Sequence, residues 1–363
     1  MGHPVPAIDL GTALHLAFER YWHPVCTRGE LDAAVGRALG VTLLGRRLAI
    51  ADLAGGGVVA LDDRCPHRSA ALSCGSSDSQ GLRCAYHGWR FGPDGRCNDI
   101  PSMPDGPIPA RAAVTSYAVR EAYGLVWVCL DNDAGAGPDP AEPGSAARLL
   151  PLPACPLADD RAFHVIAGTP YTWPVGGPRR VENFVDLAHF AFVHDGTLGR
   201  RDDPVPPLPD IERVGGELRF VYEPPELTVD PSAMFGRSQY RIVMPLTVSI
   251  EFDLPGGARR KLWMTASPVD EGTCRVFWMH GRDDDLDGDD APYVAFQALV
   301  LAQDEPVVCS QSPRALPLEP GIELSVRTDK VSIEYRRWLK ELAEAEIVRA
   351  STNVVGMLEA VLS

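Results

Sequence analysis

Two short cysteine–histidine motifs constrain this chain more than any other feature of its sequence. Cys-Pro-His at 65–67 and Cys-Ala-Tyr-His at 84–87 are separated by sixteen residues. Two thiolates and two imidazoles can hold one tetrahedral Zn²⁺ or one [2Fe–2S] cluster. Zinc fingers usually open with a cysteine pair and close with a histidine pair, whereas each motif here supplies one of each. This favours a [2Fe–2S] cluster with two cysteines on one iron and two histidines on the other, over a zinc knuckle or two unrelated pairs. The candidate ligands are Cys65, His67, Cys84 and His87.

The residues between and after the two motifs suit loops that enclose a cluster. Gly75, Gly81 and Gly88 permit tight turns. Tyr86 and Trp89 can shield a cluster from solvent. These residues therefore predict that each motif is carried on a loop.

Charge and cysteine content bound the remaining possibilities. The formal net charge of −15 argues against nucleic acid or an anionic membrane as a partner. There is no apolar run of about 18 residues, and residues 1–10 lack a secretory signal, so we expect a cytoplasmic protein. In a reducing compartment, metal ligation is a better explanation than disulfides for the nine cysteines. Cys74 lies between the two motifs but has no neighbouring histidine, so we expect it not to be a ligand.

Strand and turn signals divide the chain into two folded parts. We expect an N-terminal segment at 1–20, an all-β domain at 21–130, a Gly/Pro/Ala-rich linker at 131–158 and an α+β domain at 159–363. The expected strands of the first domain are 41–44, 47–51, 58–61, 118–121 and 125–130. In the last part we expect an antiparallel sheet of 218–222, 238–244, 246–252, 262–267 and 274–279, with helices at 181–194, 293–304 and 333–348.

A second group of polar residues lies on the expected helix at 181–194. Asn183, Asp186 and His189 fall along one stripe of a helix. His194 is five residues beyond His189, about 140° further around a straight helix. Both histidines can therefore reach one metal only if the helix ends, bends or widens near Val193.

Two histidines need a third ligand to make a non-haem iron site. Such sites use two histidines and one carboxylate, which leaves positions open for O₂. Asp304 is the best distant candidate, because it ends an apolar stretch just before Pro306, where we expect the helix to be disturbed. A solvent-exposed aspartate is the alternative.

These patterns resemble the catalytic subunits of Rieske non-haem iron oxygenases. The first match is Cys-x-His, sixteen residues and Cys-x-x-His followed by Gly-Trp-x-Phe; the second is Glu-Asn-Phe-x-Asp-x-x-His-x(4)-His at 182–194, with Gln-Asp at 303–304. The segment 329–338 resembles the smaller members, which include vanillate demethylases. The resemblance implies a Rieske domain followed by a helix-grip catalytic domain.

The resemblance also implies site roles, cofactors and partners. His189, His194 and Asp304 would bind Fe(II), and Asp186 would bridge a cluster histidine of one subunit to an iron-binding histidine of the next. That route implies a homotrimer. Asp186 and Asn183 are the candidate catalytic residues. Electrons would come from NAD(P)H through a reductase or ferredoxin. The reaction would be monooxygenation of a small apolar substrate (aromatic, polycyclic or alkaloid), or O- or N-demethylation by the same chemistry.

Several residues have more than one interpretation from sequence alone. His280 follows an expected strand and faces either the substrate pocket or the core. The candidate aromatic pocket residues are Trp173, Phe184, Phe190, Trp263, Phe277 and Phe296. The chain could instead be a pure electron carrier, or a ligand-binding protein stabilised by zinc, but neither function explains both metal motifs. No Gly-x-Gly-x-x-Gly follows a strand, so no nicotinamide site is expected on this chain.

Overall fold

The computed structural model describes residues 8–131, 150–223, 237–254 and 256–362, with backbone alone for 353–362. The chain divides into two compact units, one of Glu19–Leu152 and one of Met1–Phe18 with Pro153–Ser363. Residues 132–149 of the expected linker lie outside the described residues.

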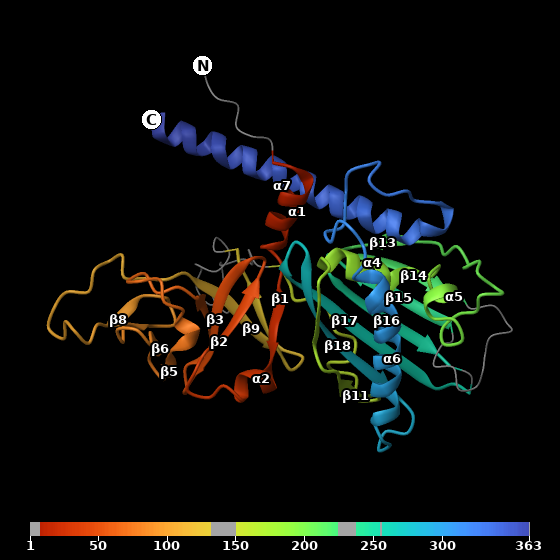
Figure 1. The fold of residues 1–363 in the computed structure, drawn as a ribbon, viewed down its shortest axis with the longest axis horizontal. Helices are drawn as coiled ribbons and strands as arrows, with labels where there is room; N and C mark the ends of the chain where they lie inside the picture. The colour runs from red at the N-terminus through yellow and green to blue at the C-terminus, as the bar shows by residue number, and fades with distance from the viewer. Residues whose placement is uncertain (1–7, 132–149, 224–236, 255, 363) are drawn as a thin grey trace. The chain divides into compact units, whose positions relative to one another are not determined.

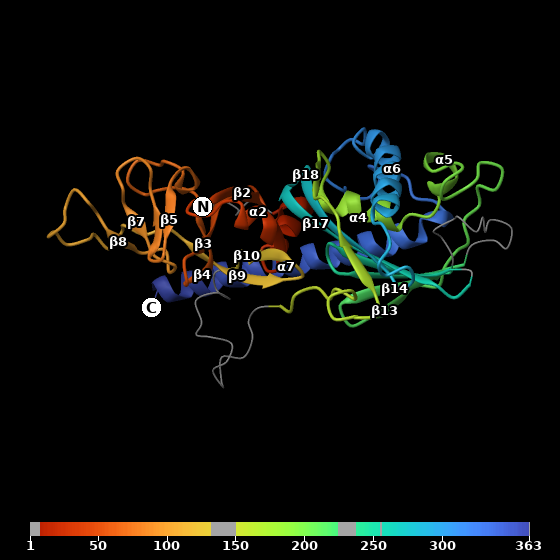
Figure 2. The same ribbon diagram turned by 90° about the horizontal axis from the view of Figure 1, so that it is seen from below.

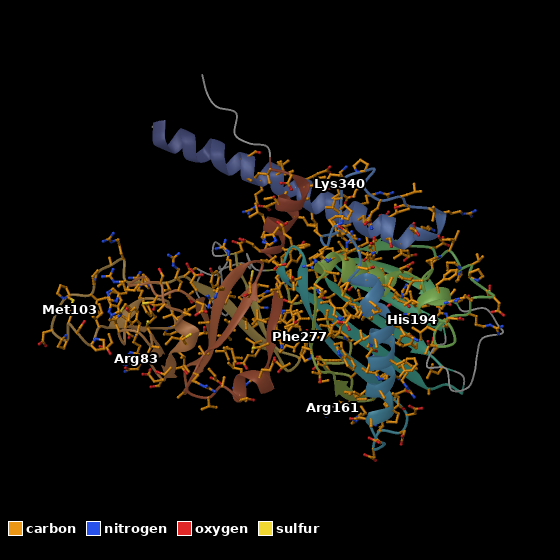
Figure 3. All side chains as sticks on the ribbon, in the orientation of Figure 1. Arg83, Met103, Arg161, His194, Phe277 and Lys340 are labelled. Atoms are coloured by element: carbon orange, nitrogen blue, oxygen red, sulfur yellow. The ribbon has the colours of Figure 1, made fainter. Side chains whose placement is uncertain are left out.

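The unit Glu19–Leu152 is built on two antiparallel sheets (Figure 1). The larger has the order β1 (His23–Thr27), β10 (Leu125–Cys129), β9 (Ser116–Ala122), β4 (Gly57–Asp62), β3 (Arg46–Leu53) and β2 (Leu39–Leu43). The smaller has the order β5 (Ser76–Asp78), β6 (Gly81–Arg83), β7 (Arg90–Phe91) and β8 (Cys97–Asp99), with η1 (Leu72–Cys74) before it. Arg83 and Met103 lie at the loop-rich end of this unit (Figure 3).

Local sequence explains how this unit forms. Thr27 caps the short helix α2 (Arg28–Asp32) in a reciprocal capping box with Glu30. The apolar run of β3 is fully buried, and the strand is paired on both edges, with β2 and β4. Its side chains join a core that also contains Cys65 and Cys84, so the two candidate cluster loops are anchored in the core of the unit.

The second unit is built on an eight-stranded antiparallel sheet. Its order is β11 (His164–Ala167), β18 (Thr273–Arg282), β17 (Arg259–Asp270), β16 (Thr247–Asp253), β15 (Arg237–Val243), β14 (Glu217–Tyr222) and β13 (Glu212–Val214), and β12 (Tyr171–Trp173) also pairs with β18. The helices are α1 (Leu10–Phe18), α4 (Gly177–Val185), α5 (Phe190–Val193), α6 (Ala291–Val308) and α7 (Lys330–Leu362), with η2 (Arg327–Asp329) before α7. Figure 1 shows α6 lying across one face of the sheet.

The terminal helices of this unit pack on each other. The N-terminal α1 lies against α7, as Figures 1 and 2 both show. Further along, the buried hydroxyl of Tyr335 on α7 donates to the carbonyl of Pro245, 2.8 Å away, which ties α7 to the turn between β15 and β16. None of the described helices is long and apolar enough to cross a membrane.

An all-β unit followed by an antiparallel sheet with helices confirms the expected α+β class. Two helix predictions were inaccurate. The helix expected at 181–194 is two helices, α4 and α5, separated by a break at 186–189 that was not expected, whereas the expected end near Val193 is present because α5 ends there. The helix expected to end near Asp304 continues through Pro306 to Val308, because proline removes only one helical hydrogen bond and the next turn re-forms.

Candidate metal centres and adjoining cavity

The two cysteine–histidine motifs fold into loops of the same backbone design. The amide of Ser69 donates to the Cys65 carbonyl at 2.9 Å, and the amide of Gly88 donates to the Cys84 carbonyl at 3.0 Å. Ser69 and Gly88, each four residues after its cysteine, both have left-handed backbone, with φ of 58° and 72°. Glycine adopts the left-handed conformation at position 88 without strain, because it has no Cβ. Ser69 adopts the same conformation at some cost in strain. Both thiols are thereby held in equivalent, buried positions.

The two histidines of these loops face each other beside the thiols. The ring centroids of His67 and His87 are 4.5 Å apart, and His67 stacks on Trp89. His67 Nδ1 is buried and has no hydrogen-bond partner among the described residues. Such an atom is costly unless a ligand satisfies it, so the set fits a [2Fe–2S] cluster bound by two cysteines and two histidines. Cys74, which lies between the two motifs, is exposed at the end of η1.

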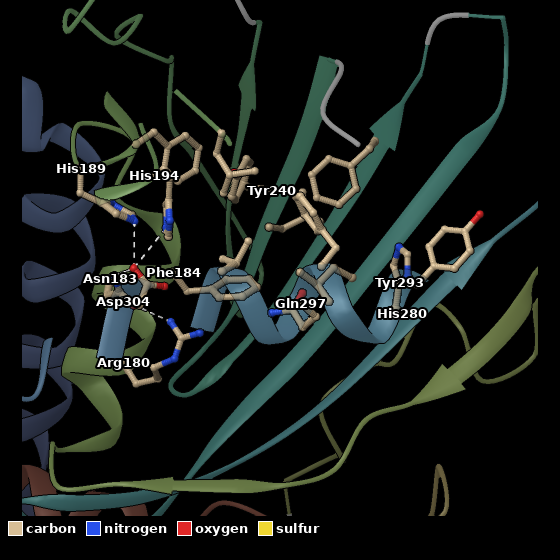
Figure 4. Close-up of a pocket in the computed structure, with 17 residues that line it drawn as sticks. Arg180, Asn183, Phe184, His189, His194, Tyr240, His280, Tyr293, Gln297 and Asp304 are labelled. Atoms are coloured by element: carbon tan, nitrogen blue, oxygen red, sulfur yellow. Dashed lines mark hydrogen bonds and ion pairs between the residues drawn. The ribbon is translucent and has the colours of Figure 1, made fainter. Parts of the chain in front are cut away.

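The second metal centre depends on the interruption between α4 and α5. Asp186 ends α4 with extended backbone, φ −74° and ψ 131°, and its carboxylate accepts from the Ala188 amide at 3.0 Å. His189 is the N-cap of the next helix, α5, and His194 is its C-cap. The break between α4 and α5 and the end of α5 at His194 allow the two histidines to face one point, which a straight helix would prevent. Figure 4 shows both imidazoles pointing towards Asp304 of α6.

The three side chains form a compact set of metal-ligand atoms. His189 Nε2 lies 3.5 Å and His194 Nε2 3.2 Å from Oδ1 of Asp304, and the three ligand atoms all lie within 4.8 Å of one another. Asp304 is buried, so its solvent-exposed alternative is wrong. Two imidazoles and one carboxylate on one side of a site are typical of non-haem Fe(II).

The other ring nitrogens are fixed by hydrogen bonds. His189 Nδ1 donates to Asp186 Oδ2 at 3.2 Å, and His194 Nδ1 donates to the amide oxygen of Gln303 at 2.8 Å. The Gln303 amide is oriented by Thr197, whose hydroxyl accepts from its Nε2 at 3.2 Å. Each bond leaves Nε2 free to bind a metal, which supports the fit to iron.

The charges at this centre are strongly coupled. Burial disfavours a charged His189, but the carboxylates of Asp186 and Asp304 outweigh burial and raise its pKa to about 9. Burial likewise opposes ionisation of Asp304, yet hydrogen bonds from His189 and His194 and the charge of Arg180 hold its pKa well below the usual range. Asp304 is therefore an anion, as a metal ligand must be.

Asn183 connects this centre to a residue that the sequence patterns did not single out. Its Nδ2 donates to Asp304 Oδ1 at 3.2 Å, and its Oδ1 accepts from Arg180 at 2.7 Å. Arg180 lies one helical turn before Asn183 on α4, and this spacing was the available sequence signal.

A cavity opens beside the three ligand side chains and extends along α6. Figure 4 shows His189, His194 and Asp304 at one end, His280 and Tyr293 at the other, and Gln297 of α6 between them. Of the candidate pocket residues, Phe184, Phe190, Phe296 and His280 line the cavity. Trp173, Trp263 and Phe277 are instead buried core residues.

Comparison with protein-family models assigns both units. Residues 21–118 match the Rieske [2Fe-2S] domain, and residues 178–345 match the vanillate O-demethylase oxygenase C-terminal domain.

Relatives match nearly the whole chain. Methylxanthine N1-demethylase NdmA of Pseudomonas putida is 38% identical over 90% of this chain and 89% of its own length. Methylxanthine N3-demethylase NdmB of the same organism is 39% identical over 89% of each chain. The solved structure of NdmA with caffeine superposes with a TM-score of 0.82 at 36% identity, covering 92% of this chain and 93% of that chain. A 115-residue part of this chain is also 37% identical to the oxidoreductase NdmD of P. putida, covering 31% of this chain and 19% of NdmD.

The motifs, the fold and the relatives of both units all indicate the same protein family. The chain belongs to the Rieske non-haem iron oxygenases, with a [2Fe–2S] cluster and a mononuclear iron as cofactors, and to the branch that has a vanillate demethylase-type catalytic domain.

Proposed function

We propose that this chain is the oxygenase component of a multicomponent N-demethylase whose substrate is a neutral N-methylated heteroaromatic of the methylxanthine class. The [2Fe–2S] cluster is bound by Cys65, His67, Cys84 and His87, and the iron by His189, His194 and Asp304. Asp186 and Asn183 support the iron site from either side.

The observation that carries this proposal is the polarity of the cavity. Tyr240 of β15, Gln297 of α6 and His280 of β18 line it, and the buried hydroxyl of Tyr240 has no hydrogen-bond partner among the described residues. Buried polar groups normally have partners, so this hydroxyl is available to a ligand, with the polar side chains of Gln297 and His280 beside the same cavity. Burial, together with the cations Arg260 and Arg282, lowers the pKa of His280 to about 4 and keeps it neutral. A flat ring with carbonyl oxygens and ring nitrogens offers matching donors and acceptors.

The charges of the cavity argue against an anionic aromatic acid. Arg180 is the one arginine or lysine among the lining residues, and it is already engaged by Tyr171, Asn183 and the charge of Asp304. A benzoate-type substrate with its carboxylate near the His189, His194 and Asp304 end would have no unengaged arginine or lysine beside it among the described lining residues. O-demethylation of a methoxy-aromatic acid is therefore the second candidate, supported by the vanillate demethylase-type domain.

The chain's own residues bind and orient the substrate. Iron held by His189, His194 and Asp304 would supply O₂ activation, and a cluster held by Cys65, His67, Cys84 and His87 would supply the electrons. The neutral polar groups hold the ring so that one N-methyl group points to the end with His189, His194 and Asp304. Phe184, Phe190 and Phe296 exclude water from that end. Overall, R₂N–CH₃, O₂, two electrons and two protons give R₂N–H, formaldehyde and water.

The proposed assembly is a homotrimer in which the cluster of one copy serves the iron of the next. Asp186 lines a polar cavity that also borders His189 and Leu324, and the Leu324 side chain is 90% exposed. On the other unit, His87 and Tyr86 are exposed at the cluster loops. An exposed apolar rim around Asp186 suits docking of these loops from a second copy.

The electron source and compartment follow from the same chemistry. Electrons come from NAD(P)H through a separate reductase or ferredoxin, in line with the similarity to part of the oxidoreductase NdmD. None of the nine cysteines, all of which lie among the described residues, forms a disulfide, which suits a reducing cytoplasm.

A single-turnover assay tests this function. Reduced, iron-loaded protein is mixed with O₂ and either caffeine, theobromine or a series of methoxybenzoates, and products and formaldehyde are quantified. We expect methylxanthines to lose one methyl group with stoichiometric formaldehyde, and Asp304→Ala to give none. Turnover of methoxybenzoates alone would replace N-demethylation by O-demethylation, and a ring-hydroxylated product without formaldehyde would rule out both.

A further inference from the structure

Arg180 is a buried cation that is linked to the iron site through Asn183. Its side chain is 2% exposed and lies on α4, one turn before Asn183. An arginine in such a position is costly unless its donors and its charge are both satisfied.

An aromatic enclosure holds the guanidinium in place. Its carbon lies 5.0 Å from the ring centroid of Trp173 and 5.1 Å from that of Phe184, distances typical of cation–π contacts. Nε donates to the hydroxyl of Tyr171 at 2.8 Å. These contacts leave Nη1 directed to Asn183.

The bond from Arg180 decides which end of the Asn183 amide faces the metal ligand. The carbonyl oxygen of Asn183 accepts from Arg180 Nη1 at 2.7 Å, so its NH₂ group is directed to Asp304 Oδ1, 3.2 Å away. The reversed amide would place the NH₂ group of Asn183 against the Arg180 donor and its carbonyl oxygen against the Asp304 carboxylate. Figure 4 shows this series, with Arg180 on the side of Asp304 away from the two histidines.

We propose that Arg180 is a positioning residue of the iron site, acting through Asn183: it fixes the amide so that its NH₂ group holds Asp304 Oδ1 towards His189 and His194. This rests on the proposed iron ligands and not on the proposed substrate. The expected consequence is a higher affinity for the metal, because partners that orient a ligand typically contribute about 10- to 100-fold.

Metal affinity of the full-length protein tests the proposal without turnover. Apoprotein is titrated with Co²⁺ against a chelator, and the absorption of the bound ion reports its coordination. We expect Arg180→Met to bind about 10- to 100-fold more weakly. The matched control is Arg179→Met: Arg179 is equally buried on α4, but its side chain bonds to the Pro313 carbonyl and Glu323, away from Asp304, so its metal affinity should equal that of the wild type.

A double-mutant cycle separates positioning from the effect of charge. If Arg180 acts through Asn183, Asn183→Ala should weaken metal binding, and adding Arg180→Met should weaken it no further. If the two losses add, Arg180 acts by its charge alone and positioning is overturned. Wild-type affinity in Arg180→Met also overturns it. If wild type and Asp304→Ala bind Co²⁺ equally, the assignment of the iron ligands is at fault instead.

A milder variant keeps the test open if Arg180→Met does not fold. Tyr171→Phe removes the acceptor of Arg180 Nε and keeps the ring. A smaller loss of Co²⁺ affinity, absent in the Asn183→Ala background, would support the proposal. The proposal would be overturned if Tyr171→Phe and a folded Arg180→Lys variant both bound Co²⁺ with the wild-type affinity.

Discussion

At the residue scale, the ring nitrogen that does not face the metal is held differently in the two histidines. His189 Nδ1 has the carboxylate of Asp186 as partner, whereas His194 Nδ1 has the neutral amide of Gln303. A carboxylate partner increases the basicity of an imidazole more than an amide does. The two histidines therefore differ as ligands, although both belong to one short segment.

The amide partner gives a prediction for Gln303. Gln303→Leu should weaken iron binding by about 10- to 100-fold, because His194 loses the acceptor that fixes its tautomer. Gln303→Glu restores an acceptor and should retain most of the binding. Iron content after dialysis measures both, and equal iron content in Gln303→Leu and wild type would contradict the role.

Removing the hydroxyl of Tyr240 should have opposite effects on the stability of the ligand-free protein and on substrate binding. It is buried without a partner among the described residues, which costs about 1–3 kcal/mol in the ligand-free protein. Tyr240→Phe should therefore raise the melting temperature of the ligand-free protein, while KM for the substrate rises about 5- to 10-fold from loss of one hydrogen bond of about 1 kcal/mol. A lower melting temperature would show that the hydroxyl has a structural role.

Residue type and spacing revealed the ligand candidates and two supporting residues, Asp186 and Asn183, but not the roles of Gln303 and Tyr240. Cys65, His67, His189 and His194 are chemically distinctive and close to partners in sequence. Gln303 lies on a helix, and its role follows from a hydrogen bond to His194, which is 109 residues away in sequence. Tyr240 lies on strand β15, and its role follows from the orientation of that strand. Sequence periodicity does not determine which strands border a cavity.

At the scale of elements, the interruption between α4 and α5 brings the histidines together. The sequence indicated that a helix carrying both would have to change direction, yet it did not locate the change at 186–189. Asp186 ends α4 by capping its own turn through the Ala188 amide, a local hydrogen bond typical of aspartate. An amphipathic pattern continues across such a break, so periodicity alone does not detect it.

The loop after α5 gives a prediction about how this helix is held. A Cβ added at Gly199 would lie 2.4 Å from the carbonyl carbon of Phe190, the first residue of α5. Gly199→Ala should displace α5 and with it His194, lowering both iron content and melting temperature. Gly216→Ala, where an added Cβ has open space, is the control and should leave iron content unchanged. Normal iron content in Gly199→Ala would show that the loop can move without the helix.

At the scale of the whole molecule, proposed electron transfer between copies predicts complementation. Cys84→Ser loses the cluster but keeps the iron site, and Asp304→Ala loses the iron but keeps the cluster. Each variant alone should be inactive. Mixed after unfolding or coexpressed, they should recover activity, since a cluster on one copy can serve the iron of its neighbour. Continued inactivity of mixed oligomers, verified by mass spectrometry, would place the route within one chain.

The two-part organisation was evident from composition, but the partition of the termini was not. The sequence predicts a separate N-terminal segment, whereas α1 packs on α7 in the unit that contains Pro153–Ser363. The residues of α1 and α7 are more than three hundred positions apart, and no local pattern encodes their contact. The strands, by contrast, followed from local alternation and turn residues.

The three polar residues of the cavity wall have an evolutionary consequence. Tyr240, Gln297 and His280 belong to three different elements, β15, α6 and β18. The rings of Tyr240 and His280 pack on Phe220 and Tyr293, so replacements that keep a ring at these two positions change the polar group and preserve the packing. Selection can thus move the enzyme among related heterocycles in small steps while the metal centres stay fixed, and a library randomised at these three positions is the natural start for engineering a new regioselectivity.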